Sequence, residues 1–105
     1  MLRSFKALKV WQKSYELCLK TYRITATFPK GERYGLTSQI RRSAVSIPSN
    51  LAYGSICELE TQILLAADIG FIDTGNQGET IGRIKEVERM LKALIRTLEQ
   101  KHLDP

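Results

Sequence analysis

Apolar residues recur at steps of three and four residues in four separate segments of this chain, which is the spacing of one helix face. No segment shows the alternation of apolar and polar residues that indicates a half-buried strand. Helical segments with short connections are typical of an antiparallel bundle. The sequence therefore predicts an all-α fold, an antiparallel helical bundle of four helices in a single domain covering residues 1–105. The expected helices cover about residues 4–27, residues 36 to about 48, about 55–72 and about 80–101, with a polar loop at 73–79 and a tail from residue 102.

The joint between the second and third helices is marked by Pro48, which lacks a backbone donor and clashes with the preceding turn of a helix. If residues 36–70 formed one helix, the apolar residues before Pro48 would lie on the face of Ile47. Those after it would lie on a face about 140° away. A break within residues 48–54 explains this change of face. The alternative is a long kinked middle helix, which would leave three helices in all. The expected N-terminal caps are Thr37 or Ser38 for the second helix and Ser55 for the third.

Two neighbouring apolar stripes run along the first helix, so its apolar arc exceeds the ~100° that a surface helix normally buries. We expect this helix either to lie between two others or to contact a second subunit as well. Its aromatic residues Trp11, Tyr15 and Tyr22 are assigned to core packing rather than base stacking, because they lie on an apolar stripe. The expected residues of a subunit interface are Val10, Leu17, Ile24 and Phe28.

The remaining face of the first helix is mainly cationic. The chain holds 16 Lys and Arg against 11 Asp and Glu, a formal charge of +5, which favours an acidic partner such as nucleic acid. An ordinary solvated face is the alternative. Arg41 and Arg42 of the second helix could likewise bind phosphate or pair with carboxylates of other helices. The candidate carboxylates are Glu58, Glu60 and Glu86. The candidate nucleic-acid-binding residues are Lys6, Lys9, Lys13, Lys20, Arg23, Arg41 and Arg42.

The sequence shows no catalytic or metal-binding set. Its one histidine, His102, lies near the C-terminal end, and no serine has an activating base nearby in sequence. We therefore expect no enzyme activity, no metal and no cofactor. Cys18 and Cys57 both fall at apolar helical positions and are expected to be buried free thiols. A cytoplasmic protein without membrane contact is expected, because no apolar run approaches the ~18–20 residues of a membrane span and no signal peptide is evident.

Several motifs share one known pattern. The most distinctive is the run Ser38–Ala52, Ser-Gln-Ile-Arg-Arg-Ser-Ala-Val-Ser-Ile-Pro-Ser-Asn-Leu-Ala, with Phe5–Lys13 and Phe28–Leu36 before it and Glu58–Gln62 after it. These motifs resemble the four-helix-bundle proteins encoded in intervening sequences of bacterial 23S ribosomal RNA genes. The resemblance implies a non-enzymatic protein that forms ring-like pentamers. Such proteins are similar to the accessory protein of diversity-generating retroelements, so the implied partners are further copies of the chain, RNA or DNA, and a reverse-transcriptase-like protein.

The chain departs from that family after Ala52. Members usually continue with an acidic residue and glycine, a basic loop and several helical turns before the Gly-Ser that matches Gly54-Ser55. We therefore expect shortened second and third helices that the first and fourth overhang, or a continuous middle helix exchanged between subunits. The leading hypothesis is a self-associating bundle whose basic surface contacts nucleic acid. The alternatives are a protein-interaction scaffold without nucleic-acid binding and a degenerate, internally deleted family member.

Overall fold

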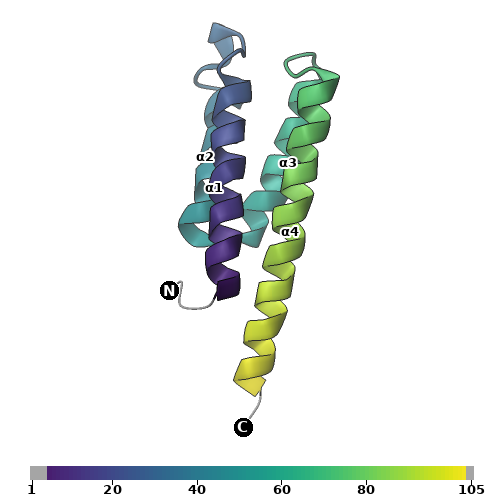
Figure 1. Cartoon of the computed structure of the whole chain (residues 1–105). Coiled ribbons are helices and arrows are strands. Elements are labelled where there is room, and N and C mark those ends of the chain that lie inside the picture. Colours follow the sequence, from purple (N-terminus) through teal and green to yellow (C-terminus); the bar gives the residue numbers. More distant parts are fainter. Residues whose placement is uncertain (1–4, 104–105) are drawn as a thin grey trace.

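The computed structural model is a bundle of α-helices (Figure 1), which confirms the predicted all-α fold. It describes the backbone of residues 5–103 and the side chains of residues 5–100. Within that range there are four α-helices and no strand. Each helix contacts two others, in the order α1, α2, α3, α4 and back to α1, so the four surround one core. The elements are α1 (Phe5–Thr25), the 3-10 turn η1 (Lys30–Glu32), α2 (Leu36–Asn50), α3 (Tyr53–Asp68) and α4 (Thr74–Leu103).

The core is built from one face of each helix. Full burial of an aliphatic side chain contributes about 1.5–3 kcal/mol, so these positions dominate the stability of the bundle. The face of α1 also buries hydroxyls, but Ser14 and Thr21 each donate to a carbonyl of their own helix at 2.8 Å and leave no polar group unpaired there. Among the most deeply buried side chains are Val10 and Leu17 of α1, Ile40 and Ile47 of α2, Ile56, Leu59 and Ile63 of α3, and Ile84, Val87 and Leu91 of α4.

The predicted break between α2 and α3 is confirmed, and the single kinked middle helix is wrong. Helix α2 continues through Pro48 and ends at Asn50, because a proline in the last turn removes only one intrahelical bond. Leu51 then takes a left-handed conformation, with φ of 49°, and reverses the chain. A non-glycine residue seldom adopts this conformation, so packing of the half-buried Leu51 side chain against the core offsets its cost.

The start of α2 differs from the prediction, because Thr37 and Ser38 lie inside the helix rather than at its cap. The backbone N–H of Leu36 is instead satisfied by the Glu32 carboxylate, which accepts it at 3.3 Å. Gly35 makes room for that carboxylate, since a Cβ at this position would lie 3.2 Å from Glu32 Oε1. The capping group therefore comes from the turn before the helix.

Helix α3 begins two residues before the predicted cap and ends four residues before the predicted end. Ser55 lies in its first turn, where its hydroxyl bonds the Ser46 hydroxyl of α2. The helix stops early because Gly70 has φ of +88°, a left-handed conformation that glycine adopts without steric cost. The Phe71 N–H then bonds the Ala66 carbonyl at 2.8 Å, which is the pattern of a glycine-terminated helix.

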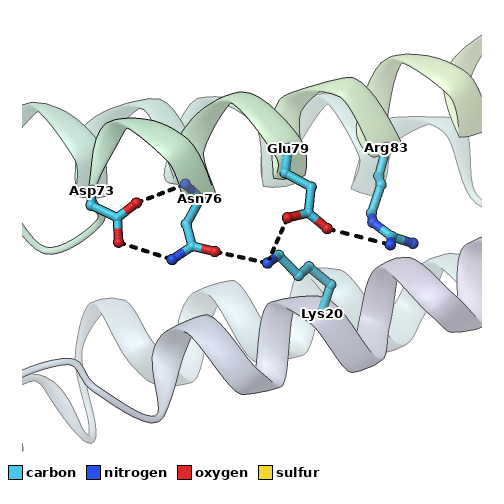
Figure 2. Close-up of polar contacts among 5 residues, drawn as sticks. All are labelled: Lys20, Asp73, Asn76, Glu79 and Arg83. Carbon is cyan, nitrogen blue, oxygen red and sulfur yellow. Dashed lines mark hydrogen bonds and ion pairs between the residues drawn. The ribbon is translucent and has the colours of Figure 1, made fainter.

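Helix α4 begins within the stretch predicted to be a loop. Asp73 caps it, since one carboxylate oxygen accepts the Asn76 backbone N–H at 2.8 Å and the other accepts the Asn76 side-chain amide at 2.9 Å (Figure 2). The loop assigned to residues 73–79 is therefore wrong. Gly75 and Gly78 lie inside the helix because the cap and the packing of α4 outweigh the low helix propensity of glycine.

The two middle helices are short, as expected from the departure after Ala52. Helices α2 and α3 hold 15 and 16 residues, against 21 in α1 and 30 in α4. Figure 1 shows α1 and α4 extending past the α2–α3 turn at the lower end of the bundle. Exposure along α4 follows this geometry, because Leu94 is 5% exposed whereas Leu98 is 54% exposed. The expected overhang is confirmed.

Candidate nucleic-acid interface

Part of the cationic face of α1 is turned toward α4 rather than toward solvent. The Lys20 ammonium, on a side chain 15% exposed, donates to Asn76 Oδ1 at 2.8 Å and to Glu79 Oε2 at 3.1 Å (Figure 2). One step along the same seam, Lys13 Nζ lies 3.8 Å from Glu86. The two lysines are seven residues apart and so are the two glutamates, as antiparallel helices require.

The α1–α4 seam is extended by a second cation on α4. Arg83 lies 3.4 Å from Glu79 on its own helix and 3.8 Å from Glu16 on α1. The hydrogen bond from Lys20, followed by the charge of Lys20, lowers the pKa of the Glu79 carboxyl. Lys13 and Lys20 are therefore paired with carboxylates of the same chain, and their predicted role in binding phosphate stays a prediction.

The other cations predicted on α1 are exposed but separated. Lys6 and Lys9 border an apolar hollow of about 160 Å³ that Met90 and Leu94 of α4 also line. Arg23 lies in the last turn of α1, 14 residues beyond Lys9 and so about 21 Å along the axis. The structure does not bring these three side chains into one site.

Arg41 is held against α1. Its guanidinium lies 4.6 Å from the Tyr22 ring centroid, its Nε donates to Thr25 Oγ1 at 2.9 Å, and its Nη2 donates to the Tyr22 carbonyl at 3.3 Å. This arrangement orders the planar group and leaves it half-buried. The neighbouring Arg42 is exposed and has no hydrogen bond or ion pair with any of the residues that the structure describes.

The ion pairs considered for these arginines do not form, because other residues hold the candidate carboxylates. Glu58 accepts a hydrogen bond from Ser43 at 3.1 Å. Glu60 lies 2.9 Å from the Lys85 ammonium, which raises the pKa of that lysine, and Glu86 is on the α1–α4 seam. Neither guanidinium group therefore forms an ion pair with a carboxylate among the described residues, although Arg42 and Glu58 line one hollow.

A groove of about 650 Å³ runs along the outer side of α2, and we call it the α2 groove. It brings together three guanidinium groups, several hydroxyls and two tyrosine rings, and no carboxylate is among its lining residues. Arginine binds phosphate through two parallel N–H donors, and hydroxyl and amide side chains also contact the sugar–phosphate backbone. The groove is lined by Tyr22, Arg33, Tyr34, Thr37, Ser38, Arg41, Arg42, Val45, Ser46, Ser49 and Asn50.

Sequence reasoning missed most of the α2 groove, including its third arginine and its most exposed ring. Arg33 and Tyr34 lie in the turn between η1 and α2, with the guanidinium 5.7 Å from the ring centroid. The Tyr34 side chain is 88% exposed. The available signal was the adjacency of a basic and an aromatic residue in a turn that leads into the helix carrying Arg41 and Arg42. Of the predicted nucleic-acid-binding residues, only Arg41 and Arg42 lie in the groove.

The residues predicted for a subunit interface lie in the core of the chain itself. They belong to the apolar stripe of α1 that faces the shared core, so another subunit could not reach them in this fold. On the second stripe, Tyr15 is 48% and Tyr22 39% exposed, so the core assignment of these two rings is wrong, although Cys18 of the same stripe is buried. The ring of the half-buried Trp11 stacks on that of Tyr15 at 5.4 Å. The exposed fractions of the predicted interface residues are 2% for Val10, 0% for Leu17, 7% for Ile24 and 7% for Phe28.

The two cysteines differ in their surroundings. Cys18 is buried in α1, and burial raises the pKa of its thiol. Cys57 is exposed on α3, so the predicted burial holds for only one of the pair, although both are free thiols. Among the described side chains, no three histidine, cysteine or carboxylate groups are close enough together to hold a metal ion. His102 lies outside the described side chains.

Comparison with known proteins places the chain beside one family. The family model of the 23S rRNA-intervening sequence protein matches residues 6–56, which cover α1, α2 and the first turn of α3. No curated protein matches the chain. Within residues 5–103, no helix is long and apolar enough to cross a membrane. The resemblance drawn from the sequence is confirmed, and from α1 to the start of α3 the chain carries the sequence pattern of the 23S rRNA-intervening sequence protein family.

Proposed function

We propose that this protein is a non-enzymatic helical bundle that binds nucleic acid through the α2 groove. The observation that carries the proposal is the gathering of Arg33, Arg41 and Arg42 in one open groove without a lining carboxylate. The lysines of the α1–α4 seam, by contrast, already have acidic partners. The name of the matched family refers to 23S rRNA, which is compatible with an RNA-related role.

The chemistry of the groove suits a phosphate backbone. A guanidinium presents a planar fork of donors that matches phosphate, and Arg41 is already ordered by its contacts with α1. Ordering before binding reduces the side-chain entropy lost in the complex. Ser38 offers a further hydroxyl donor along the same side of α2, whereas the Ser49 hydroxyl donates to the Val45 carbonyl at 2.8 Å. Arg42, which has no partner within the described residues, is the cation most available to a ligand.

The test is the salt dependence of binding to a short labelled RNA strand, measured by fluorescence anisotropy. Three neutralised phosphates give a slope of about −2 for log affinity against log salt, from ~0.7 per phosphate on a single strand. Arg42→Ala should weaken binding and reduce the magnitude of that slope by about 0.7. Lys9→Ala is the matched control, because it removes the same charge from an exposed site outside the α2 groove.

Two results would contradict the proposal. One is the absence of binding at low salt. The other is a greater loss for Lys9→Ala than for Arg42→Ala, because phosphate contact would then belong to α1 and not to the α2 groove.

A second candidate function, self-association, is favoured by the exposed apolar side chains of α1. We call Leu8, Trp11, Tyr15 and Leu19 the outer α1 stripe; three of the four are at least 40% exposed. Exposed apolar side chains gathered on one helix face are a feature of protein contact sites. We propose that further copies of the chain cover it, in the pentamer that the family resemblance implies.

Sedimentation measurements test the self-association. The natural chain should sediment as an oligomer, and Tyr15→Glu should convert it to a folded monomer because the side chain is 48% exposed and outside the core. Leu65→Glu on α3 is the matched control, with 49% exposure, and should leave the assembly intact. A natural chain that sediments as a monomer, or equal effects of the two variants, would rule out this contact.

A further inference from the structure

We infer that the α2 groove selects single-stranded over duplex nucleic acid, with the Tyr34 ring stacking on an unpaired base. The inference rests on the proposed function, since it concerns the class of nucleic acid that the same groove takes. It is carried by the combination of exposed rings and guanidinium groups in one open groove.

Tyr34 is placed to serve as a stacking platform. Its side chain is 88% exposed, the highest exposure among the large hydrophobic residues described, and it contributes to the lining of the α2 groove. The adjacent Arg33 guanidinium lies 5.7 Å from the ring centroid, so a cation accompanies the ring. A base stacked on Tyr34 would therefore carry its own phosphate close to Arg33.

The same combination recurs where the groove meets α1. The Tyr22 ring is 39% exposed, and the Arg41 guanidinium lies 4.6 Å from its centroid. Two ring–guanidinium pairs thus border one groove, with the free cation Arg42 also lining it. Sites for single strands in proteins combine a positive groove that follows the backbone with aromatic rings that stack on the bases.

A duplex cannot use the rings of this groove. Its bases are already stacked on one another and paired, so only its phosphates are available to the guanidinium groups. Stacking on an aromatic side chain contributes about 1–3 kcal/mol per base, which corresponds to at least about fivefold in affinity. A single strand gains both contributions, whereas a duplex gains the phosphate contribution alone.

The experiment compares an unstructured 12-nucleotide RNA with the 12-base-pair duplex of the same sequence, by fluorescence anisotropy at one low salt concentration. The single strand should bind at least fivefold more tightly. Tyr34→Ala should weaken single-strand binding by about fivefold or more and leave duplex binding unchanged. Tyr34→Phe, which keeps the ring, should bind like the natural chain. Arg42→Ala should weaken both ligands.

The outcomes separate this inference from the proposed function. Equal affinity for the two ligands, or unchanged single-strand binding by Tyr34→Ala while Arg42→Ala weakens it, overturns the stacking role and leaves phosphate binding by the groove intact. Loss of binding by Tyr34→Phe as well as Tyr34→Ala would assign the contact to the hydroxyl, which also overturns the inference. No binding of either ligand overturns the proposed function itself. Folding is not at risk, because the Tyr34 side chain is almost wholly exposed.

Discussion

The adjacent arginines of α2 should respond very differently to truncation. Arg41 joins α2 to α1 through a hydrogen bond to Thr25 Oγ1 at 2.9 Å and a guanidinium lying 4.6 Å from the Tyr22 ring centroid. A hydrogen bond with one charged partner contributes about 1.5 kcal/mol at the lower end of its range, and a cation–π contact at a partly exposed site about 0.5 kcal/mol. We therefore expect Arg41→Ala to lower the free energy of unfolding by about 2 kcal/mol.

That free energy converts into a measurable change of melting temperature. With an unfolding entropy of about 2.1 cal/mol/K per residue, a chain of 105 residues loses about 9 °C for 2 kcal/mol. Arg42→Ala should change the melting temperature by no more than ~2 °C, because the side chain is exposed and makes no hydrogen bond, ion pair or ring contact within the described residues. Circular dichroism at one protein concentration measures both, since the proposed self-association would make melting depend on concentration. Equal losses for the two variants, or a change below ~2 °C for Arg41→Ala, would refute the assignment of Arg41 as a link between helices.

Three further predictions concern the α4 cap, the thiols and the α1–α4 seam. Hydrogen bonds from the first turn of α4 lower the pKa of Asp73, so its stabilising contribution is present above the ordinary aspartate pKa and is lost as pH falls below about 4. Asp73→Asn should keep the cap and lose that part of the acid dependence, as measured by urea unfolding across pH. A thiol reagent should modify Cys57 quickly and Cys18 only on unfolding. Rapid modification of both thiols would contradict the burial of Cys18. Lys20→Met should lower the melting temperature more than Lys9→Met, and the difference should shrink with added salt; no difference at low salt would contradict the seam.

The helices and the break between α2 and α3 could be predicted because apolar spacing depends only on local periodicity. The change of apolar face after Ile47 is a property of the sequence, and it located the joint to within a few residues. The ends of the helices were less predictable, because their caps use side chains outside the usual positions. The Glu32 carboxylate, in the turn before α2, accepts the backbone N–H of the first residue of that helix. Asp73 caps α4 although two glycines follow it.

The candidate site was only partly predictable, because charge pairing depends on which helices become neighbours. The cationic spacing of α1 was visible, but the glutamates that pair with Lys13 and Lys20 face them only after α4 packs antiparallel to α1. Tyr34 likewise reaches the α2 groove through the path of the turn and not through any helical repeat. The choice of which α1 stripe is buried also depended on neighbours, since both stripes are apolar.

Because α4 overhangs the bundle, the amide hydrogens of its middle turns and those of its last turns differ in their protection from solvent. Its middle turns, around Ile84 and Val87, are enclosed by the other helices, so their amide hydrogens should exchange only when the whole bundle opens. Beyond Leu94, the helix extends past the α2–α3 turn and Leu98 is exposed, so its amides should exchange through fraying that leaves the rest folded. Shortening of the two middle helices thus concentrates local opening at the C-terminal end of α4. Deuterium uptake should therefore increase along α4 toward that end.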